Sequence, residues 1–173
     1  FDDEPDNIPE ATYEGVNFVE QVSCKEVMHY NQGAEKKVVL VDCGVKNNII
    51  RCLTHRGVEV IRVPWDYDFN DLEFDGLFLA NGPGDPNTCV KAVENIRKFL
   101  QPEEKRPCMG ICMGNQLLSK AAGATVYKLK YGHRSHNQPV QLCGTNKCYV
   151  TSQNHGYAVD SATLPKDWTP LFI

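Results

Sequence analysis

A chain of 173 residues is long enough for one ordinary domain with at most a short appendage. A domain of that size can bury enough apolar surface to fold without a disulfide or a structural metal. Apolar residues make up 42% and charged residues 23%, which excludes a disordered chain. The net charge of -4 argues against a nucleic-acid partner, and no apolar run reaches the ~20 residues that span a bilayer. We therefore expect a cytoplasmic protein that binds neither nucleic acid nor membrane.

The first 35 residues differ in composition and apolar periodicity from the rest of the chain. They are acidic, are interrupted by Pro5, Pro9 and Gly33, and hold no sustained apolar period. A short apolar, β-branched run begins soon after Lys36. We therefore interpret residues 1–35 as a linker or interdomain segment and residues 36–173 as the folded domain.

Strand and helix patterns alternate from Lys36 onward. Short apolar runs predict strands over 38–41, 59–63, 76–80 and 108–111. Helical apolar spacing predicts helices over 46–56, 88–100 and 114–122, and Gly57 supplies a stop for the first of them. This alternation predicts an α/β fold, a mostly parallel open sheet flanked by helices. After Gly123 the residues alternate in polarity, and another run lies near 148–151, so we expect antiparallel or edge strands attached to the parallel core.

The eight cysteines are scattered through apolar strand and helix patterns, so we expect most of them to be buried and unpaired. Cys108 and Cys112 lack a second, correctly spaced Cys/His pair, and no zinc site is predicted. The densest basic stretch is typical of a solvated strand face. It comprises Lys128, Lys130, His133 and Arg134.

The sharpest local feature is the pentapeptide GICMG at residues 110–114, between a predicted strand and a predicted helix. It has the form of the G-x-S-x-G nucleophile elbow, in which small flanking residues allow a turn tight enough to present the central side chain. The N-terminus of the following helix favours the thiolate of Cys112, which is the reactive form. Taken alone, the pentapeptide is equally consistent with a buried cysteine in a glycine-rich turn.

Two further clusters accompany this pentapeptide. The loop NGPGDP, residues 81–86, follows a predicted strand at its carboxyl end, where ligands bind in open α/β sheets. Backbone amides of such a loop, together with the amide of Met113, can stabilise an oxyanion, although a structural turn would also explain it. Residues 152–157, with side-chain amides, an imidazole and a glycine, are taken alone typical of a hairpin turn.

Four motifs together resemble a known family in order and spacing: NGPGDP, GICMGNQLL, YGHRSHNQPV and TSQNHGYAVD. They are similar to the class I (triad-type) glutamine amidotransferases, and among them to the amidotransferase domain of the carbamoyl phosphate synthetase small chain. The resemblance covers residues 36–173 and implies a flavodoxin-like fold with added antiparallel strands.

The resemblance implies a role for each matched position. Cys112 would be the nucleophile, and Gly84 and Met113 would donate oxyanion amides. The residues implied to contact L-glutamine are Gly82, Gly84, Met113, Gln116, Asn154, Gly156 and Tyr157. The implied chemistry is thiolate attack on the side-chain amide of glutamine, loss of ammonia, and hydrolysis of the glutamyl thioester.

The resemblance also implies a partner, which is a carbamoyl phosphate synthetase large chain or a fused synthetase domain. That partner would use ammonia, bicarbonate and ATP to make carbamoyl phosphate. ATP and metal are expected on the partner, and no cofactor or metal site is expected in this chain. Whether the product would serve arginine or pyrimidine biosynthesis is left open.

The sequence departs from the family in two places. The family's base, a histidine oriented by an acid, lies on an F-H-P-E-like stretch, and none occurs here. The resemblance does not make His155 the base, and His133 and His136 are interpreted as polar loop residues. We therefore expect a fragment, truncated before the catalytic His and Glu and lacking normal glutaminase turnover. At Asn115 the family usually has histidine, and asparagine cannot titrate.

Three other functions remain consistent with parts of the sequence. One is the amidotransferase of another synthetase, such as one for anthranilate, GMP or aminodeoxychorismate, although YGHRSHNQPV and SQNHGYAVD favour the carbamoyl phosphate branch. Another is a non-catalytic assembly module, which the missing base would fit and the intact Cys112 opposes. A thiol-redox protein would explain the elbow cysteine but gives no reason for NGPGDP.

Overall fold

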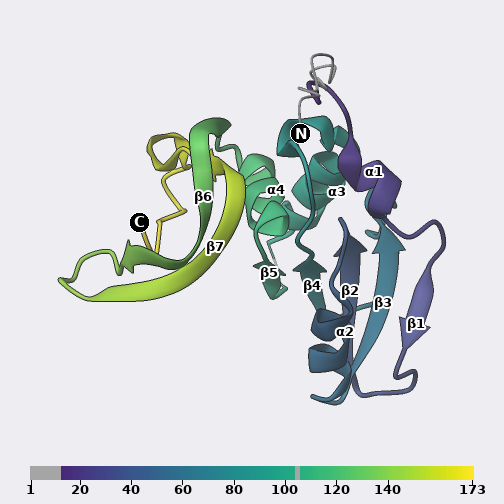
Figure 1. Cartoon of the computed structure of the whole chain (residues 1–173). Helices are drawn as coiled ribbons and strands as arrows, with labels where there is room; N and C mark the ends of the chain where they lie inside the picture. Colours follow the sequence, from purple (N-terminus) through teal and green to yellow (C-terminus); the bar gives the residue numbers. More distant parts are fainter. Residues whose placement is uncertain (1–12, 104–105) are drawn as a thin grey trace, which may run out of the picture.

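A computed structural model describes residues 13–103 and 106–173 (Figure 1). Its main sheet has five strands in the order β1-β3-β2-β4-β5. The parallel strands are β2 (Lys36–Asp42), β3 (Val58–Pro64), β4 (Gly76–Leu79) and β5 (Cys108–Gly110), and β1 (Met28–Tyr30) pairs antiparallel with β3. The predicted α/β fold with a mostly parallel sheet is confirmed, and the predicted strands appear with bounds shifted by a few residues.

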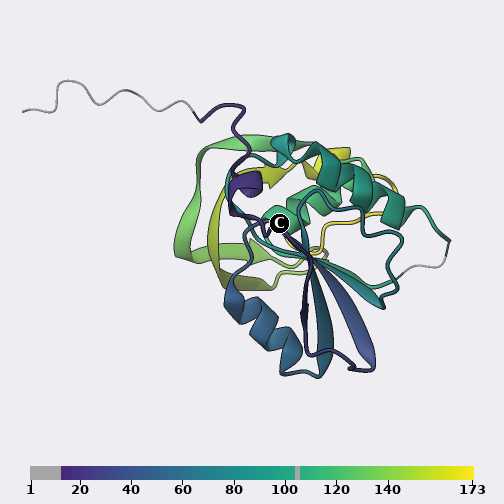
Figure 2. The same ribbon diagram turned by 90° about the vertical axis from the view of Figure 1, so that its right-hand side faces the viewer.

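Helices cover both faces of this sheet (Figure 2). Helix α2 (Asn47–Thr54) lies on one face, whereas α3 (Val90–Leu100) and α4 (Met113–Ala122) lie on the other. Strand β2 serves both layers: Val39 and Val41 join the larger core with α3 and α4, and Leu40 joins the smaller core with α2. A strand buried on both faces must be apolar at successive positions, which explains why its run does not alternate.

Strands β6 (Val126–Gln141) and β7 (Cys148–Val159) form a second, antiparallel sheet of their own. The prediction of added antiparallel strands is confirmed, but the expectation that they would attach to the parallel core was wrong. Figure 1 shows α4 beside this hairpin, and β7 contacts α4. The antiparallel strand that does join the parallel sheet is β1.

Part of the predicted linker contributes to the folded body. Helix α1 (Phe18–Val22) begins at Asn17, whose Oδ1 accepts a hydrogen bond from the Glu20 amide at 3.1 Å. Val19 is fully buried in the larger core. Residues 1–12 of the predicted linker lie outside the described residues, and a domain boundary at residue 35 stays a prediction.

The cysteine prediction was partly wrong. All eight cysteines are free, but only Cys43 and Cys89 are buried, and Cys52 and Cys148 are exposed. Cys52 lies on the outer side of α2 and Cys148 begins β7, so neither faces a core. The basic stretch on β6 is solvent-exposed at Lys128, Lys130, His133 and Arg134, as predicted.

Within residues 13–103 and 106–173, no helix has the length and apolar character needed to cross a membrane. In the same part of the chain, no group of three or more His, Cys, Asp or Glu side chains is placed to hold a metal ion.

Candidate active site

Cys112 occupies a strained turn between β5 and α4. Its backbone has φ of 51° and ψ of -105°, and it is one of two non-glycine residues with positive φ in the described chain. Such a conformation is unfavourable for a residue with a side chain and persists only where the surroundings enforce it. The turn is fixed on one side by the amide of Ile111, which donates to the Leu79 carbonyl at 3.0 Å. The strand–turn–helix geometry predicted for the pentapeptide is present.

The two glycines of the pentapeptide are required by close backbone contacts. A Cβ on Gly110 would lie 2.5 Å from the carbonyl carbon of Gly114, because the first turn of α4 folds back over β5. A Cβ on Gly114 would lie 2.1 Å from the carbonyl oxygen of Leu79, because α4 packs directly on β4. Neither position can accept a side chain without a shift of the backbone, so G-x-C-x-G here is a packing requirement.

The NGPGDP loop continues β4 at its carboxyl end, beside the elbow. A Cβ on Gly82 would lie 2.1 Å from the carbonyl oxygen of Cys43, so the loop rests on the turn that follows β2. Asn81 Nδ2 donates to the carbonyl of Gly44 at 3.3 Å and joins the two segments. Asp85 then begins a short 3-10 helix by accepting the Asn87 amide at 2.8 Å.

A buried carboxylate fixes the turn behind this loop. Asp42, fully buried at the end of β2, accepts hydrogen bonds from the amides of Cys24, Gly44 and Val45 at 2.8 to 2.9 Å. It also accepts two hydrogen bonds from Arg62, one from Nε at 3.0 Å and one from Nη2 at 2.6 Å. Burial alone would raise the pKa of Asp42, but these hydrogen bonds outweigh burial and hold the pKa below its ordinary value.

Every predicted site residue lines one small cavity of about 200 Å³ at this edge of the sheet. The elbow supplies Cys112 and Met113, the loop supplies Gly82 and Gly84, and α4 supplies Gln116. The opposite wall is the segment of β7 from Asn154 to Tyr157. This volume is below the ~300 Å³ at which drug-sized sites begin, so it suits a small ligand.

The interpretation of residues 152–157 as a hairpin turn was wrong. They lie inside β7, and the turn of the hairpin comes earlier in the chain, between Gln141 and Cys148. Four successive residues of β7, 154–157, line the cavity, where Gln116 Nε2 donates to the Tyr157 carbonyl at 2.8 Å. Three lining residues were not predicted as site residues: Pro83, Arg134 and His155. Arg134 belongs to the motif YGHRSHNQPV and His155 to the motif TSQNHGYAVD. Their place in these motifs could have identified both as site residues.

No histidine in the described part of the chain is recorded as a hydrogen-bond partner of Cys112. The Cys112 thiol donates to the Asn154 carbonyl at 3.8 Å. Both ring nitrogens of His155 are engaged, Nδ1 with the Tyr157 carbonyl at 2.7 Å and Nε2 with Gln153 Oε1 at 2.9 Å. His133, interpreted as a loop residue, instead lies on β6 with its ring 4.9 Å from that of His155. The hydrogen bonds of His155 agree with the expectation that it is not the base.

His136 also lies on β6, where its Nδ1 is 3.1 Å from Ser152 Oγ. The interpretation of His133 and His136 as loop residues was therefore wrong, because both belong to a long strand with two register shifts. Asn115 is exposed on α4, and the side chain of Ser119 donates to its carbonyl at 2.9 Å.

Burial raises the pKa of the Cys112 thiol, and the Met113 amide and the charge of Lys46 oppose this rise without cancelling it. The helix N-terminus therefore acts in the predicted direction but is outweighed by desolvation. A thiol with a raised pKa is protonated at neutral pH, so it needs a base before it can attack.

Alkylation of Cys112 by iodoacetamide is therefore expected to keep accelerating as the pH rises past the ordinary cysteine value of about 8.5. Replacing Lys46 with glutamine removes an opposing charge, raises the pKa further and should slow alkylation at about pH 8 by about threefold at low salt. Peptide mass spectrometry would measure the rate at Cys112. The control is Lys147→Gln, whose charge is not among those acting on Cys112. A rate that levels off near neutral pH would contradict the raised pKa.

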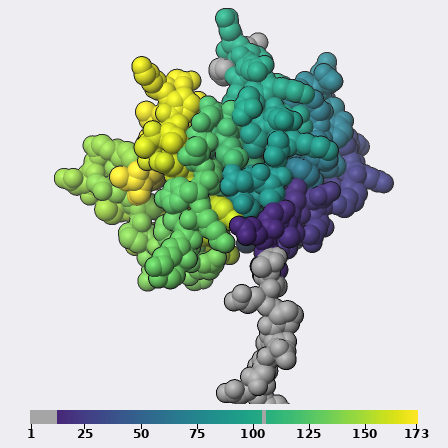
Figure 3. Space-filling view, turned by 90° about the horizontal axis from the view of Figure 1, so that it is seen from above, coloured from purple at the N-terminus to yellow at the C-terminus, as the bar shows by residue number. Residues whose placement is uncertain are grey.

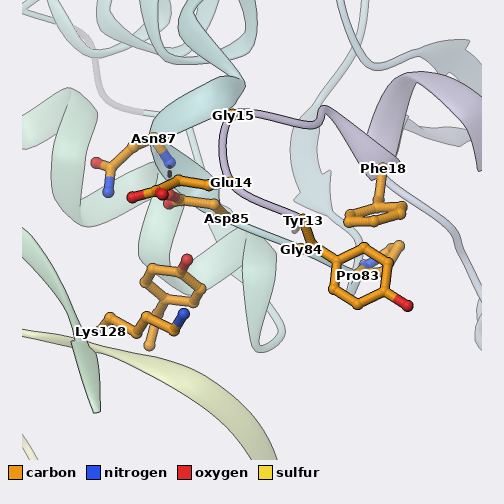
Figure 4. Close-up of a pocket in the computed structure, with 10 residues that line it drawn as sticks. Tyr13, Glu14, Gly15, Phe18, Pro83, Gly84, Asp85, Asn87 and Lys128 are labelled. Atoms are coloured by element: carbon orange, nitrogen blue, oxygen red, sulfur yellow. Dashed lines mark hydrogen bonds between the residues drawn. The ribbon is translucent and has the colours of Figure 1, made fainter. Parts of the chain in front are cut away.

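A wider cavity of about 940 Å³, here called the antechamber, adjoins the small one (Figure 4). Its wall includes Tyr13 and Phe18 from the N-terminal segment, and Glu14, Asp85 and Lys128 supply its charged groups. Figure 3 looks down on this region and shows the purple N-terminal segment in the surface of the molecule. The antechamber shares Pro83, Gly84 and Tyr157 with the small cavity. Because the nucleophile candidate lines the small cavity, we place the site there.

Comparison with known proteins shows which family this chain belongs to. The family model for glutamine amidotransferase class-I matches residues 39–173. The chain is 51% identical over 156 residues to multifunctional protein CAD of Squalus acanthias, which covers 90% of this chain and 7% of that protein. It is 48% identical over 176 residues to the carbamoyl phosphate synthase arginine-specific small chain of Saccharomyces cerevisiae, covering 97% of this chain and 43% of that one. The chain thus spans less than half the length of these relatives.

Among solved structures, a putative GMP synthase protein from Thermoplasma acidophilum superposes with a TM-score of 0.65 at 26% identity. The match covers 79% of this chain and 72% of that one. The fold described above is therefore shared with this solved protein.

Proposed function

The chain belongs to the class I glutamine amidotransferases, and from that premise we propose that it is the glutaminase part of a carbamoyl phosphate synthetase. The observation that carries the glutaminase proposal is the strained elbow, which presents Cys112 to a small cavity together with Gly84 and Met113. The name of the yeast relative, at 48% identity, supports the choice of synthetase.

In the proposed reaction, glutamine enters the small cavity with its side-chain amide at Cys112. The thiolate sulfur bonds to the amide carbon, and the carbonyl electrons move onto oxygen, where the amides of Gly84 and Met113 stabilise the charge. The C–N bond then breaks as the nitrogen takes up the proton that the thiol gave to a base, ammonia leaves, and a glutamyl thioester remains on Cys112. Water hydrolyses the thioester, which releases glutamate and restores the thiol.

The remaining wall of the cavity would orient the substrate. We propose that Gly82, Gln116, Asn154, Gly156 and Tyr157 contact glutamine, as the resemblance implies. The hydrogen bond from Gln116 to the Tyr157 carbonyl supports a fixed relation between α4 and β7 across the cavity. Gly156 leaves the backbone of β7 open toward the ligand.

The ammonia would pass to a synthetase that combines it with bicarbonate and ATP to form carbamoyl phosphate. We propose that this partner carries the ATP and metal sites. The relatives are named a multifunctional protein and a small chain, which supports either a fused synthetase domain or a separate large chain. An amidotransferase for GMP synthesis is a weaker candidate, because the solved relative of that name is only 26% identical.

Replacing Cys112 with alanine in the assembled enzyme, with its synthetase part, tests this proposal. We expect glutamine-dependent formation of carbamoyl phosphate to fall by about a thousandfold or more, as for loss of a nucleophile. Synthesis from free ammonia, bicarbonate and ATP should be unchanged, because ammonia bypasses this site. If both activities persisted, Cys112 would not be the nucleophile. If both were lost, its role would be structural.

A further inference from the structure

Arg134 extends a guanidinium into the wall of the small cavity that Cys112 also lines. It lies on β6, on the stretch that the sequence presents as a solvated basic strand face. In the β6–β7 pairing, Arg134 lies opposite Asn154. The carbonyl of Asn154 accepts a hydrogen bond from the Cys112 thiol at 3.8 Å. The guanidinium and the thiol therefore belong to one short stretch of cavity wall.

The guanidinium lies beside two glycines, Gly132 and Gly156. A Cβ on Gly132 would be 2.5 Å from Arg134 Nη1, and a Cβ on Gly156 would be 3.5 Å from Nη2. Gly132 has φ of 72° and stands where the β6–β7 register shifts between Lys128 and His133. The Arg134 side chain thus folds back across the hairpin, beside backbone positions that carry no side chain. Its Nη1 donates to the carbonyl of Tyr131, which holds this conformation.

The charge of Arg134 is not matched by a carboxylate within residues 13–103 and 106–173. The ion pairs recorded there involve other cations, and the recorded hydrogen bond of the guanidinium goes to the Tyr131 carbonyl. A guanidinium carries five N–H donors in a planar fork, so donors remain for a ligand. That fork suits a carboxylate, which it can bind through two parallel hydrogen bonds.

We propose that Arg134 binds the α-carboxylate of glutamine, an inference that rests on the function proposed above. Glutamine carries its reactive amide at one end and its carboxylate at the other, separated by a short aliphatic chain. With the amide at Cys112, the carboxylate can reach the guanidinium on the far side of Asn154, because directly paired residues of adjacent strands lie about 5 Å apart. Arg134 would thereby select a free amino acid over an amide within a peptide.

The test compares two ligands as protectants of Cys112 in the 173-residue chain. Iodoacetamide labels Cys112, and the concentration of ligand that halves the rate is measured by peptide mass spectrometry. The ligands are L-glutamine and its α-amide, which has the same side chain but no carboxylate. In the wild-type chain we expect glutamine to protect at a concentration about tenfold or more below that of the α-amide, as a charge-assisted hydrogen bond predicts.

In Arg134→Gln, the half-protecting concentration of glutamine should rise about tenfold or more. The variant should then be protected equally well by glutamine and by the α-amide. The matched control is Lys130→Gln, an exposed cation on the same strand that does not line the small cavity, and it should keep the preference. The rate of labelling without ligand, and the circular dichroism spectrum, report whether Arg134→Gln is folded as the wild type is.

Each outcome decides between the two proposals. If glutamine protects the wild type and Arg134→Gln keeps the preference for glutamine, the carboxylate role is wrong and the glutaminase proposal stands. If the variant weakens protection by glutamine and by the α-amide equally, Arg134 only positions β7, and the carboxylate role is again wrong. If glutamine does not protect the wild type at all, the proposed function fails, and the inference fails with it.

Discussion

Replacing Gly114 with alanine is expected to lower the free energy of unfolding by about 3 kcal/mol and to abolish the reactivity of Cys112 toward glutamine analogues. The added Cβ would lie 2.1 Å from the carbonyl oxygen of Leu79. Leu79 is fully buried in β4, so its backbone cannot move aside, and α4 must shift away from the sheet. That shift would displace Cys112, which stands at the start of α4. Urea unfolding followed by circular dichroism measures the stability.

Gly57→Ala is the matched control for this prediction. Unlike Gly114, Gly57 has positive φ, at 74°, and nothing lies within 4 Å of an added Cβ. Its substitution should therefore cost only the backbone strain of about 1 kcal/mol. Equal urea midpoints for the two variants would show that contact between α4 and β4 does not hold the elbow in place.

Replacing Asp42 with asparagine is expected to cost about 3 to 5 kcal/mol, because it breaks a buried ion pair from one side. The asparagine amide has one acceptor oxygen where the carboxylate has two, so some of the bonds from Arg62, Gly44 and Val45 are lost. Because the turn at Gly44 supports the NGPGDP loop, the variant should also react more slowly at Cys112. Asp66→Asn, which removes an exposed pair with Lys91, is the control and should cost far less.

The pH dependence of stability gives a second measurement on the same residue. The pKa of Asp42 is lowered in the folded protein, so its contribution is present above the unfolded pKa of about 3.9 and is lost as the pH falls through the folded pKa. The wild type should therefore lose stability in acid below about pH 4, and Asp42→Asn should lack that portion of the loss. If both proteins lost stability in parallel, the hydrogen bonds to Asp42 would not be stabilising its charged form.

The parallel sheet could be predicted because local pattern and tertiary position agree there. The run at 38–41 is apolar at successive residues since its two faces meet different helices. Strand β1 could not be predicted in this way, because three residues are too few to show a period. The hairpin was predicted as strands from its alternation, but its place against α4 depends on contacts between distant segments, which no local pattern encodes.

Some features of the candidate site could be predicted from the sequence and others could not. The elbow and its glycines follow from local backbone requirements, and the motifs of the family resemblance identified residues that the fold brings to one cavity. Arg134 is exposed, as predicted, but its place in the cavity wall could not be predicted, because charge on a strand does not reveal a register shift that brings the side chain across the hairpin. The raised pKa of Cys112 was missed, since desolvation depends on the packing around the turn and the helix N-terminus is visible in sequence alone.

The most direct test of the account is labelling of the chain with an electrophilic analogue of glutamine, a diazoketone or chloroketone, followed by peptide mapping. We expect one label per chain, on Cys112 alone among the eight cysteines, and we expect glutamine to prevent the labelling. The exposed Cys52 and Cys148 should stay unlabelled at the same analogue concentration, because neither lines the small cavity. Labelling that spreads over the exposed cysteines, or that glutamine does not slow, would contradict the assignment of Cys112 as the nucleophile of a glutamine site.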